Sequence, residues 1–238
     1  SAWRLSGIYR LIALGWGASL ILLWRFKDVS SNVQRKPAGS LRAALPEMGK
    51  FFLPILLIVV SRSFVVVSIS TYLPTFMSFE GATLAMAGIS LSVLEGAGVV
   101  GALLAGTVSD RFGRKPVLLA AFVLSSVLMF AFLQLDQLQG WLMIVNLLLL
   151  GFFAISAQPV LLAMVQDHMM PEHRATGNGL YMSITFLVRS LVLVLIGIAG
   201  DAWGLRTTFT ISAAISALAV VPMLLLPKSE KASAVTAE

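Results

Sequence analysis

The fold is decided by the stretch Gly106-Thr-Val-Ser-Asp110-Arg-Phe-Gly113-Arg-Lys115, which joins two long apolar segments of the chain. A second copy of its pattern, Gly197-Ile-Ala-Gly-Asp201-Ala-Trp-Gly204-Leu-Arg206, also lies between two apolar segments. Both copies read G-x3-D-x2-G-x-[KR], and the offset from Gly113 to Gly204 is 91 residues. The two copies indicate an internal repeat.

The composition of the chain excludes an ordinary soluble fold. Even without its 19 Gly, 58% of the 238 residues are hydrophobic, against about 45–50% apolar residues in a soluble domain. The charged residues, only 12% of the chain, come in short bursts between long apolar runs, as expected when those runs lie in lipid. The sequence therefore predicts an all-α, polytopic membrane protein.

Hydropathy in windows of about 19 residues predicts seven transmembrane helices. They cover Leu5–Trp24, Phe51–Met77, Thr83–Val108, Pro116–Leu135, Trp141–Val165, Gly177–Gly200 and Thr207–Leu226. A signal peptide is the alternative interpretation of Leu11–Trp24, but no small-residue cleavage site precedes the basic stretch that follows it. Because each repeat has an odd number of helices, three, the second copy enters the membrane in the opposite orientation. Spans two to seven are thus predicted to form two inverted three-helix repeats, an architecture typical of secondary transporters.

Basic residues in the predicted loops gather on one side of the membrane. That side has twelve of the 17 Lys and Arg: Arg25, Lys27, Arg35, Lys36, Arg42, Lys50, Arg111, Arg114, Lys115, Arg174, Lys228 and Lys231. The other side has only Arg4 and Arg206. The positive-inside bias makes the first side cytoplasmic, so the amino end is expected outside and the carboxy terminus inside. Orientation in the lipid bilayer therefore accounts for the excess of basic residues, and a nucleic-acid partner is not expected. We expect the chain to lie in a plasma membrane, such as the bacterial inner membrane.

The longest predicted connection covers residues 25–50 and has Pro37, Gly39 and Pro46 among its charges. We interpret it as a cytoplasmic linker between two membrane units. Residues 1–24 are then the last transmembrane helix of an amino-terminal half, 51–226 a carboxy-terminal six-helix bundle and 227–238 a cytoplasmic tail. The chain is accordingly expected to be a piece of a longer protein whose amino-terminal half has a similar plan.

The first copy of the repeat resembles the G-x3-D-R-x-G-R-K signature of the major facilitator superfamily. The matching residues are Gly106, Asp110, Arg111, Gly113, Arg114 and Lys115. The resemblance implies the last helix of a first half, the central loop and all six helices of a second half. Arg62-Ser-Phe through Ser70-Thr-Tyr-Leu-Pro-Thr75 also resembles, more weakly, drug-efflux members of the fosmidomycin-resistance type.

In this superfamily the signature is taken to form a cytoplasmic latch that holds the outward-open state. Asp110 is expected to pair with Arg111 or Arg114, or to lie at a helix amino terminus of the opposing half. Gly106 is expected to let a neighbouring helix approach closely, and Gly113 to supply positive φ for the reversal into the next span. The alternative is a tight loop whose basic residues only anchor the topology.

Three charged residues lie near the midpoints of predicted spans: Arg62, Glu95 and Arg189. Each would cost about 2.5–3.5 kcal/mol on insertion scales, so they should face protein or a water-filled cavity rather than lipid. The resemblance implies that spans two, three, five and six line the cavity, and these spans carry all three charges and the amides Asn146 and Gln158. The amides are candidate cavity residues, but interhelical hydrogen bonds are the role that we favour for them.

Glu95 is the predicted proton-coupling residue. Apolar surroundings favour the protonated form of a carboxyl and a nearby Arg favours the ionised form, so its charge can change as the cavity opens to either side. A static ion pair with Arg62 or Arg189 is the alternative. The two Arg side chains are predicted to contact a substrate, and their excess over Glu95 favours an anionic one.

The predicted function is secondary active transport of a small organic compound, such as a drug, exported in exchange for protons by alternating access. Uptake by proton symport is the alternative, because the signature does not define direction. A seven-span receptor is disfavoured, since no Lys lies within a predicted span for a retinal Schiff base and the repeat has no part in it. An enzyme, a cofactor and a metal are not expected: the chain has no Cys, no His on a predicted span and no G-x4-G-K-[ST] phosphate loop.

Overall fold

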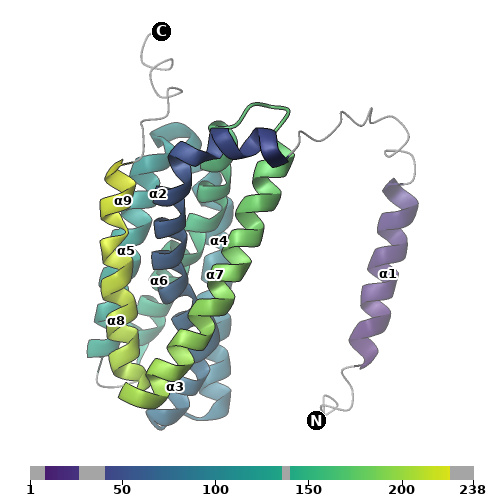
Figure 1. The fold of residues 1–238 in the computed structure, drawn as a ribbon. Coiled ribbons are helices and arrows are strands. Elements are labelled where there is room, and N and C mark those ends of the chain that lie inside the picture. The colour runs from purple at the N-terminus through teal and green to yellow at the C-terminus, as the bar shows by residue number, and fades with distance from the viewer. Residues whose placement is uncertain (1–8, 27–40, 136–139, 226–238) are drawn as a thin grey trace. The chain divides into compact units, whose positions relative to one another are not determined.

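The computed structural model describes residues 9–26, 41–135 and 140–225, which form helices and no strand (Figure 1). The helices are α1 (Tyr9–Phe26), α2 (Leu41–Val67), the π-helix η2 (Ser68–Tyr72), α3 (Leu73–Phe79), α4 (Leu84–Phe112), α5 (Arg114–Gln134), α6 (Trp141–Asp167), α7 (Arg174–Trp203), α8 (Leu205–Leu218) and α9 (Val220–Leu225). Internal contacts divide the chain into two units, residues 1–38 and 39–238. The second unit contains α2 to α9.

Six helical stretches among the described residues are long and apolar enough to cross a membrane. They are Leu53–Phe79, Leu84–Phe112, Arg114–Gln134, Trp141–Asp167, Arg174–Trp203 and Leu205–Leu224. Each agrees within a few residues with one of the predicted spans two to seven, so these spans are confirmed. The agreement follows from the length that an apolar helix needs to cross the bilayer.

The amino-terminal part of the chain differs in detail from the prediction. Helix α1 covers most of the predicted first span. Helix α2 begins at Leu41, so the last ten residues of the predicted linker 25–50 are helical. Residues 27–40 of that linker and the predicted tail 227–238 lie outside the described residues.

Helix packing in the second unit follows the pairing expected of two inverted triplets. In the first triplet α2–η2–α3 is followed by α4 and α5, and in the second α6 is followed by α7 and by α8–α9. Helix α4 packs on α6, and its counterpart α7 packs on α2. Helix α5 also packs on α6, and its counterpart α8 packs on α2. The two equivalent helices α5 and α8 pack on each other. Each of these contacts thus has its counterpart under exchange of the triplets, which supports the predicted repeat.

The two copies of the sequence pattern also make the same backbone turn. Gly113 alone separates α4 from α5, with φ 91° and ψ 150°, and Gly204 alone separates α7 from α8, with φ 82° and ψ 150°. Only glycine adopts this conformation without strain. The prediction of positive φ at Gly113 is therefore confirmed, and the same physical requirement explains the second glycine.

Helices α4 and α6 form the most extensive helix pair of the unit. A Cβ atom at Gly101 would overlap the Phe152 carbonyl oxygen, and one at Gly151 would overlap the Leu94 carbonyl oxygen. Small residues thus bring the two backbones together, as is common between membrane helices. At Gly106 no described residue lies within 4 Å of an added Cβ. The close approach predicted at Gly106 is therefore not made by a described helix of this unit, in which Gly101 meets the α6 backbone.

The stretch Leu53–Phe79, which corresponds to the second predicted span, is interrupted by η2, which ends two residues before Pro74. Proline lacks an N–H and its ring crowds the carbonyl four residues earlier, here that of Ser70, so a wider π-turn accommodates it. From this turn Tyr72 Oη donates a 3.0 Å hydrogen bond to the Leu193 carbonyl of α7. Ser68 Oγ donates to Ser212 Oγ of α8 at 3.1 Å. The interruption thus ties this span to two other helices.

Candidate functional site

A cavity of about 260 Å³ lies among α2, η2, α4, α6 and α7. Four of the five predicted cavity residues line it: Arg62 from α2, Glu95 from α4, Gln158 from α6 and Arg189 from α7. These helices are spans two, three, five and six, the set implied by the family resemblance. Glu95 and Arg189 lie on α4 and α7, which hold equivalent places in the two triplets.

The remaining wall combines hydroxyl groups with apolar side chains. These residues are Ser63, Val66, Val67, Ser70, Ile155, Met182, Thr185 and Phe186. We did not predict them from the sequence, although Val66 and Ser70 lie one and two turns from Arg62, and Met182, Thr185 and Phe186 lie one or two turns before Arg189. Residues three or four apart share a helix face, so the neighbours of each central Arg one turn away are the signal that could have found them.

Arg62 lines the cavity with its side chain partly buried. Its Nε atom is buried and has no hydrogen-bond partner among the described residues. A buried polar group that lacks a partner is costly, and a buried cation more so. The cavity thus contains a donor whose hydrogen-bonding capacity is not used within the described part of the chain.

Arg62 and Glu95 are both partly buried, and Arg189 is exposed. Within the described ranges Glu95 forms no ion pair, at the 4.0 Å limit, with Arg62 or Arg189. The alternative of a static ion pair is therefore absent from this structure. The carboxylate shares a cavity with two cations and is not locked to either.

Asn146 lies outside this cavity. The residue is buried, and its Nδ2 donates a 3.2 Å hydrogen bond to the Leu128 carbonyl of α5. Asn146 and Gln158 are twelve residues apart on α6, about 120° around a helix of 3.6 residues per turn, so they face different neighbours. The prediction of Asn146 as a cavity residue is wrong, and the favoured role, an interhelical hydrogen bond, is what the structure has.

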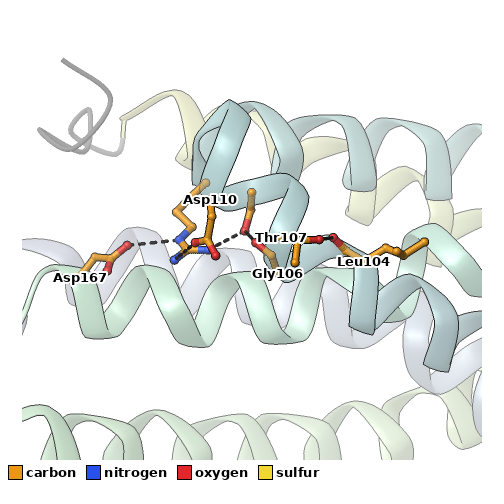
Figure 2. Close-up of polar contacts among 7 residues, drawn as sticks. Leu104, Gly106, Thr107, Asp110 and Asp167 are labelled. Carbon is orange, nitrogen blue, oxygen red and sulfur yellow. Dashed lines mark hydrogen bonds and ion pairs between the residues drawn. The ribbon is translucent and has the colours of Figure 1, made fainter. Parts of the chain in front are cut away.

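The predicted signature forms a compact polar network around Arg114 at the ends of α4 and α6 (Figure 2). Arg114 Nη2 lies 2.6 Å from Asp110 Oδ1, and its Nε lies 3.2 Å from Asp167 Oδ2. Arg114 Nη1 donates to Ser109 Oγ at 2.6 Å, and Ser109 Oγ donates to the Gly106 carbonyl at 2.9 Å. Asp110 thus pairs with one of its expected partners. We did not predict Asp167, because it lies 53 residues from Arg114 in the sequence.

The other basic residues of the signature have different surroundings. Lys115 Nζ donates a 3.0 Å hydrogen bond to the Leu224 carbonyl of α9. Arg111 is exposed and has no ion pair with a described residue. The Arg114 network therefore lies within this unit. Arg111, by contrast, is a basic residue of the signature that is available for a contact outside the unit.

The second copy of the pattern lacks this network, because Leu205 stands where the first copy has Arg114. Asp201 is exposed. Arg206 instead forms an ion pair with Glu80 at the end of α3, with a distance of 3.5 Å. The repeat conserves the backbone turn but not its side-chain contacts.

Comparisons with known proteins identify the family of the chain. The model of the family described as Major Facilitator Superfamily matches residues 2–191 and 81–238. The inner membrane transport protein YnfM of Escherichia coli K12 is 31% identical over 111 residues, which cover 47% of this chain and 26% of that protein. A protein of Archaeoglobus fulgidus is 28% identical over 162 residues, covering 66% of this chain and 70% of that protein.

A solved structure shares the fold. The xylose transporter XylE from E. coli, in its inward-open conformation, superposes with a TM-score of 0.62 at 14% sequence identity. The match covers 77% of this chain and 49% of XylE. The chain thus spans about half of XylE and about a quarter of YnfM.

Proposed function

Because the chain belongs to the major facilitator superfamily, a family of membrane transporters rather than enzymes, we propose that it forms part of a proton-coupled transporter of a small organic molecule. The observation that supports this is the cavity that gathers Arg62, Glu95, Gln158 and Arg189 from four spans. Secondary transporters bind substrate near the bilayer midplane between helices, where these residues lie along their spans.

Glu95 is the proposed proton carrier. It is the acidic residue among those that line the cavity, and it is partly buried without an ion pair to Arg62 or Arg189 in the described part of the chain. A carboxyl in such a place can gain and lose a proton as its exposure changes. Arg62, Arg189 and Gln158 are the proposed substrate contacts, and the excess of cations favours an anionic cargo.

We further propose that this chain is the last helix of one six-helix half followed by the complete second half. Only 28% of the central stretch of α4 and 22% of that of α7 are buried, against 44–50% in the other four spanning segments. Charged Arg189 lies on one of these open helices, where contact with lipid would be costly. An amino-terminal half packed on α4 and α7 would cover it and complete the cavity.

A packed amino-terminal half would also give exposed Arg111 an opposing partner, as the latch requires. In this proposal alternating access is rocking of the two halves about the cavity. The carboxy terminus lies in the cytoplasm, as the positive-inside bias predicts, and the membrane is the bacterial inner membrane, as the name of YnfM states for that relative.

The direction of transport has two candidates. Export in exchange for protons is the direction that the resemblance to drug-efflux members supports. Uptake together with protons is the alternative, and the positive charge of the cavity supports it, since a proton on Glu95 adds to the attraction for an anion.

Flux through the full-length transporter in proteoliposomes tests proton coupling. Benzenesulfonate, ethidium and glucose serve as anionic, cationic and neutral probes, and pyranine inside the vesicles reports proton movement. We expect Glu95→Gln to abolish probe-driven proton movement, because an amide cannot carry a proton. Glu172→Gln makes the same change at an exposed cytoplasmic position and should behave as the wild type. Full proton movement in Glu95→Gln would refute the assignment.

A further inference from the structure

We propose that the cargo is an organic anion whose charged group binds to Arg62, and that it binds together with a proton on Glu95 rather than in competition with it. The inference rests on the proposed function, because it assigns a cargo class and a coupling rule to the same cavity. Of the two directions of coupling, it selects joint transport.

The case for an anion begins with the unused donor of Arg62. Arg62 lines the cavity without an ion pair to a described residue, and its buried Nε has no hydrogen-bond partner among those residues. A carboxylate, sulfonate or phosphonate offers oxygens at the spacing that suits a guanidinium, which binds such groups through two parallel hydrogen bonds. A neutral or cationic cargo would leave this buried charge uncompensated.

The rest of the wall fits the body of such a molecule. Ile155 of α6 and Met182 and Phe186 of α7 contribute apolar side chains to the cavity wall. Its volume of about 260 Å³ lies just below the range of about 300–1,000 Å³ that holds drug-sized ligands. The cavity therefore suits a small amphipathic anion, such as one ring with one charged group.

The coupling rule follows from the charges around Glu95. The other charged side chains that line the cavity are Arg62 from α2 and Arg189 from α7, whereas α6 contributes neutral Gln158 and η2 the hydroxyl of Ser70. With Glu95 ionised the lining has one positive charge in excess, and protonation removes the carboxylate that repels an anion. Like charges in a partly dehydrated site repel strongly.

A proton on Glu95 and an anion on Arg62 therefore each increase the affinity for the other, and this coupling is reciprocal. Two ligands that strengthen each other's binding occupy the carrier at the same time and cross together. Exchange requires the opposite, that one ligand displaces the other.

Equilibrium binding to the full-length transporter in detergent micelles tests both statements without any need for flux. The probes are benzenesulfonate, which stays ionised across the range used, and its neutral isostere benzenesulfonamide. Calorimetric titrations are run at pH of about 4 and about 8, on either side of the ordinary pKa of a Glu carboxyl, about 4.3. We expect benzenesulfonate to bind about tenfold more tightly than the sulfonamide at the lower pH, the gain of one charge-assisted hydrogen bond.

The variants assign the effect to residues. Arg62→Gln should lose the preference for the anion, Arg62→Lys should keep part of it, and Arg206→Gln, the same change outside the cavity, should match the wild type. The preference of the wild type should fall at the higher pH. Glu95→Gln should hold its low-pH affinity at both values, which would assign the pH dependence to Glu95 rather than to a histidine.

Three results would overturn the proposal. Equal affinities for the two probes at both pH values would exclude an anion site. Tighter benzenesulfonate binding at the higher pH would show competition with the proton and favour exchange. Displacement of benzenesulfonate by phosphatidylglycerol would reassign the anion site to a lipid headgroup. If Arg62→Gln does not fold, the Arg62→Lys variant and the wild-type pH dependence decide, and failure of Glu95 as proton carrier is seen separately in the flux experiment.

Discussion

Replacing Gly151 by Ala should destabilise the bundle at its most extensive helix contact. The added methyl group would overlap the carbonyl oxygen of Leu94 on α4. That oxygen belongs to the backbone of a long helix and cannot rotate away as a side chain can. Relief therefore requires α4 and α6 to move apart, with loss of packing on either side of the contact.

The expected magnitude follows from two opposing terms. Overpacking of a tight interface costs about 1–3 kcal/mol, and the replacement of Gly by Ala inside a helix returns about 1 kcal/mol. Because the obstacle at Gly151 is backbone, the upper part of the cost applies, and the net loss is about 1–2 kcal/mol. In a chain of this size that loss lowers Tm by about 2–8 °C.

Thermal unfolding in detergent micelles measures this loss, and the chain provides matched controls. Gly88 and Gly179 are also helical, but no described residue lies within 4 Å of a Cβ added there, so Ala at either position should leave Tm unchanged or raise it. Gly101→Ala, which overlaps the Phe152 carbonyl, should behave like Gly151→Ala. If Gly151→Ala melts with the Gly88→Ala control, the two backbones do not meet as described.

Three further predictions concern the polar contacts and turns. Asp167→Asn should lower the free energy of unfolding by about 1–2 kcal/mol in thermal melts, since the pair is partly buried and Arg114 keeps a second carboxylate; an unchanged Tm would mean that the pair contributes nothing. Gly113→Ala should cost about 1–3 kcal/mol through its positive φ, and a melt equal to the wild type would contradict that turn. Tyr72→Phe should cost about 1 kcal/mol by removing the hydrogen bond to Leu193, and an unaltered Tm would show that the bond is not formed in the membrane protein.

Much of the candidate site was predictable because charge is costly within a membrane. Arg62, Glu95 and Arg189 had to face protein or water wherever the helices came to lie, and the structure places all three on one cavity with Gln158. An amide carries no such constraint. Asn146 can be satisfied by any neighbouring carbonyl, and only the rotation of α6 directs it to α5.

The sequence by itself determined the six spans of the bundle, their inverted repeat and the glycine turns at Gly113 and Gly204. Apolar length and the need for positive φ are local properties, so they are visible in the residues themselves. Tertiary structure alone decided that Arg114 reaches Asp167, that Gly101 and not Gly106 meets a neighbouring backbone, and that Arg62 is left without a partner in the described residues. These depend on how each helix is rotated and which helix it meets, which packing between distant segments sets.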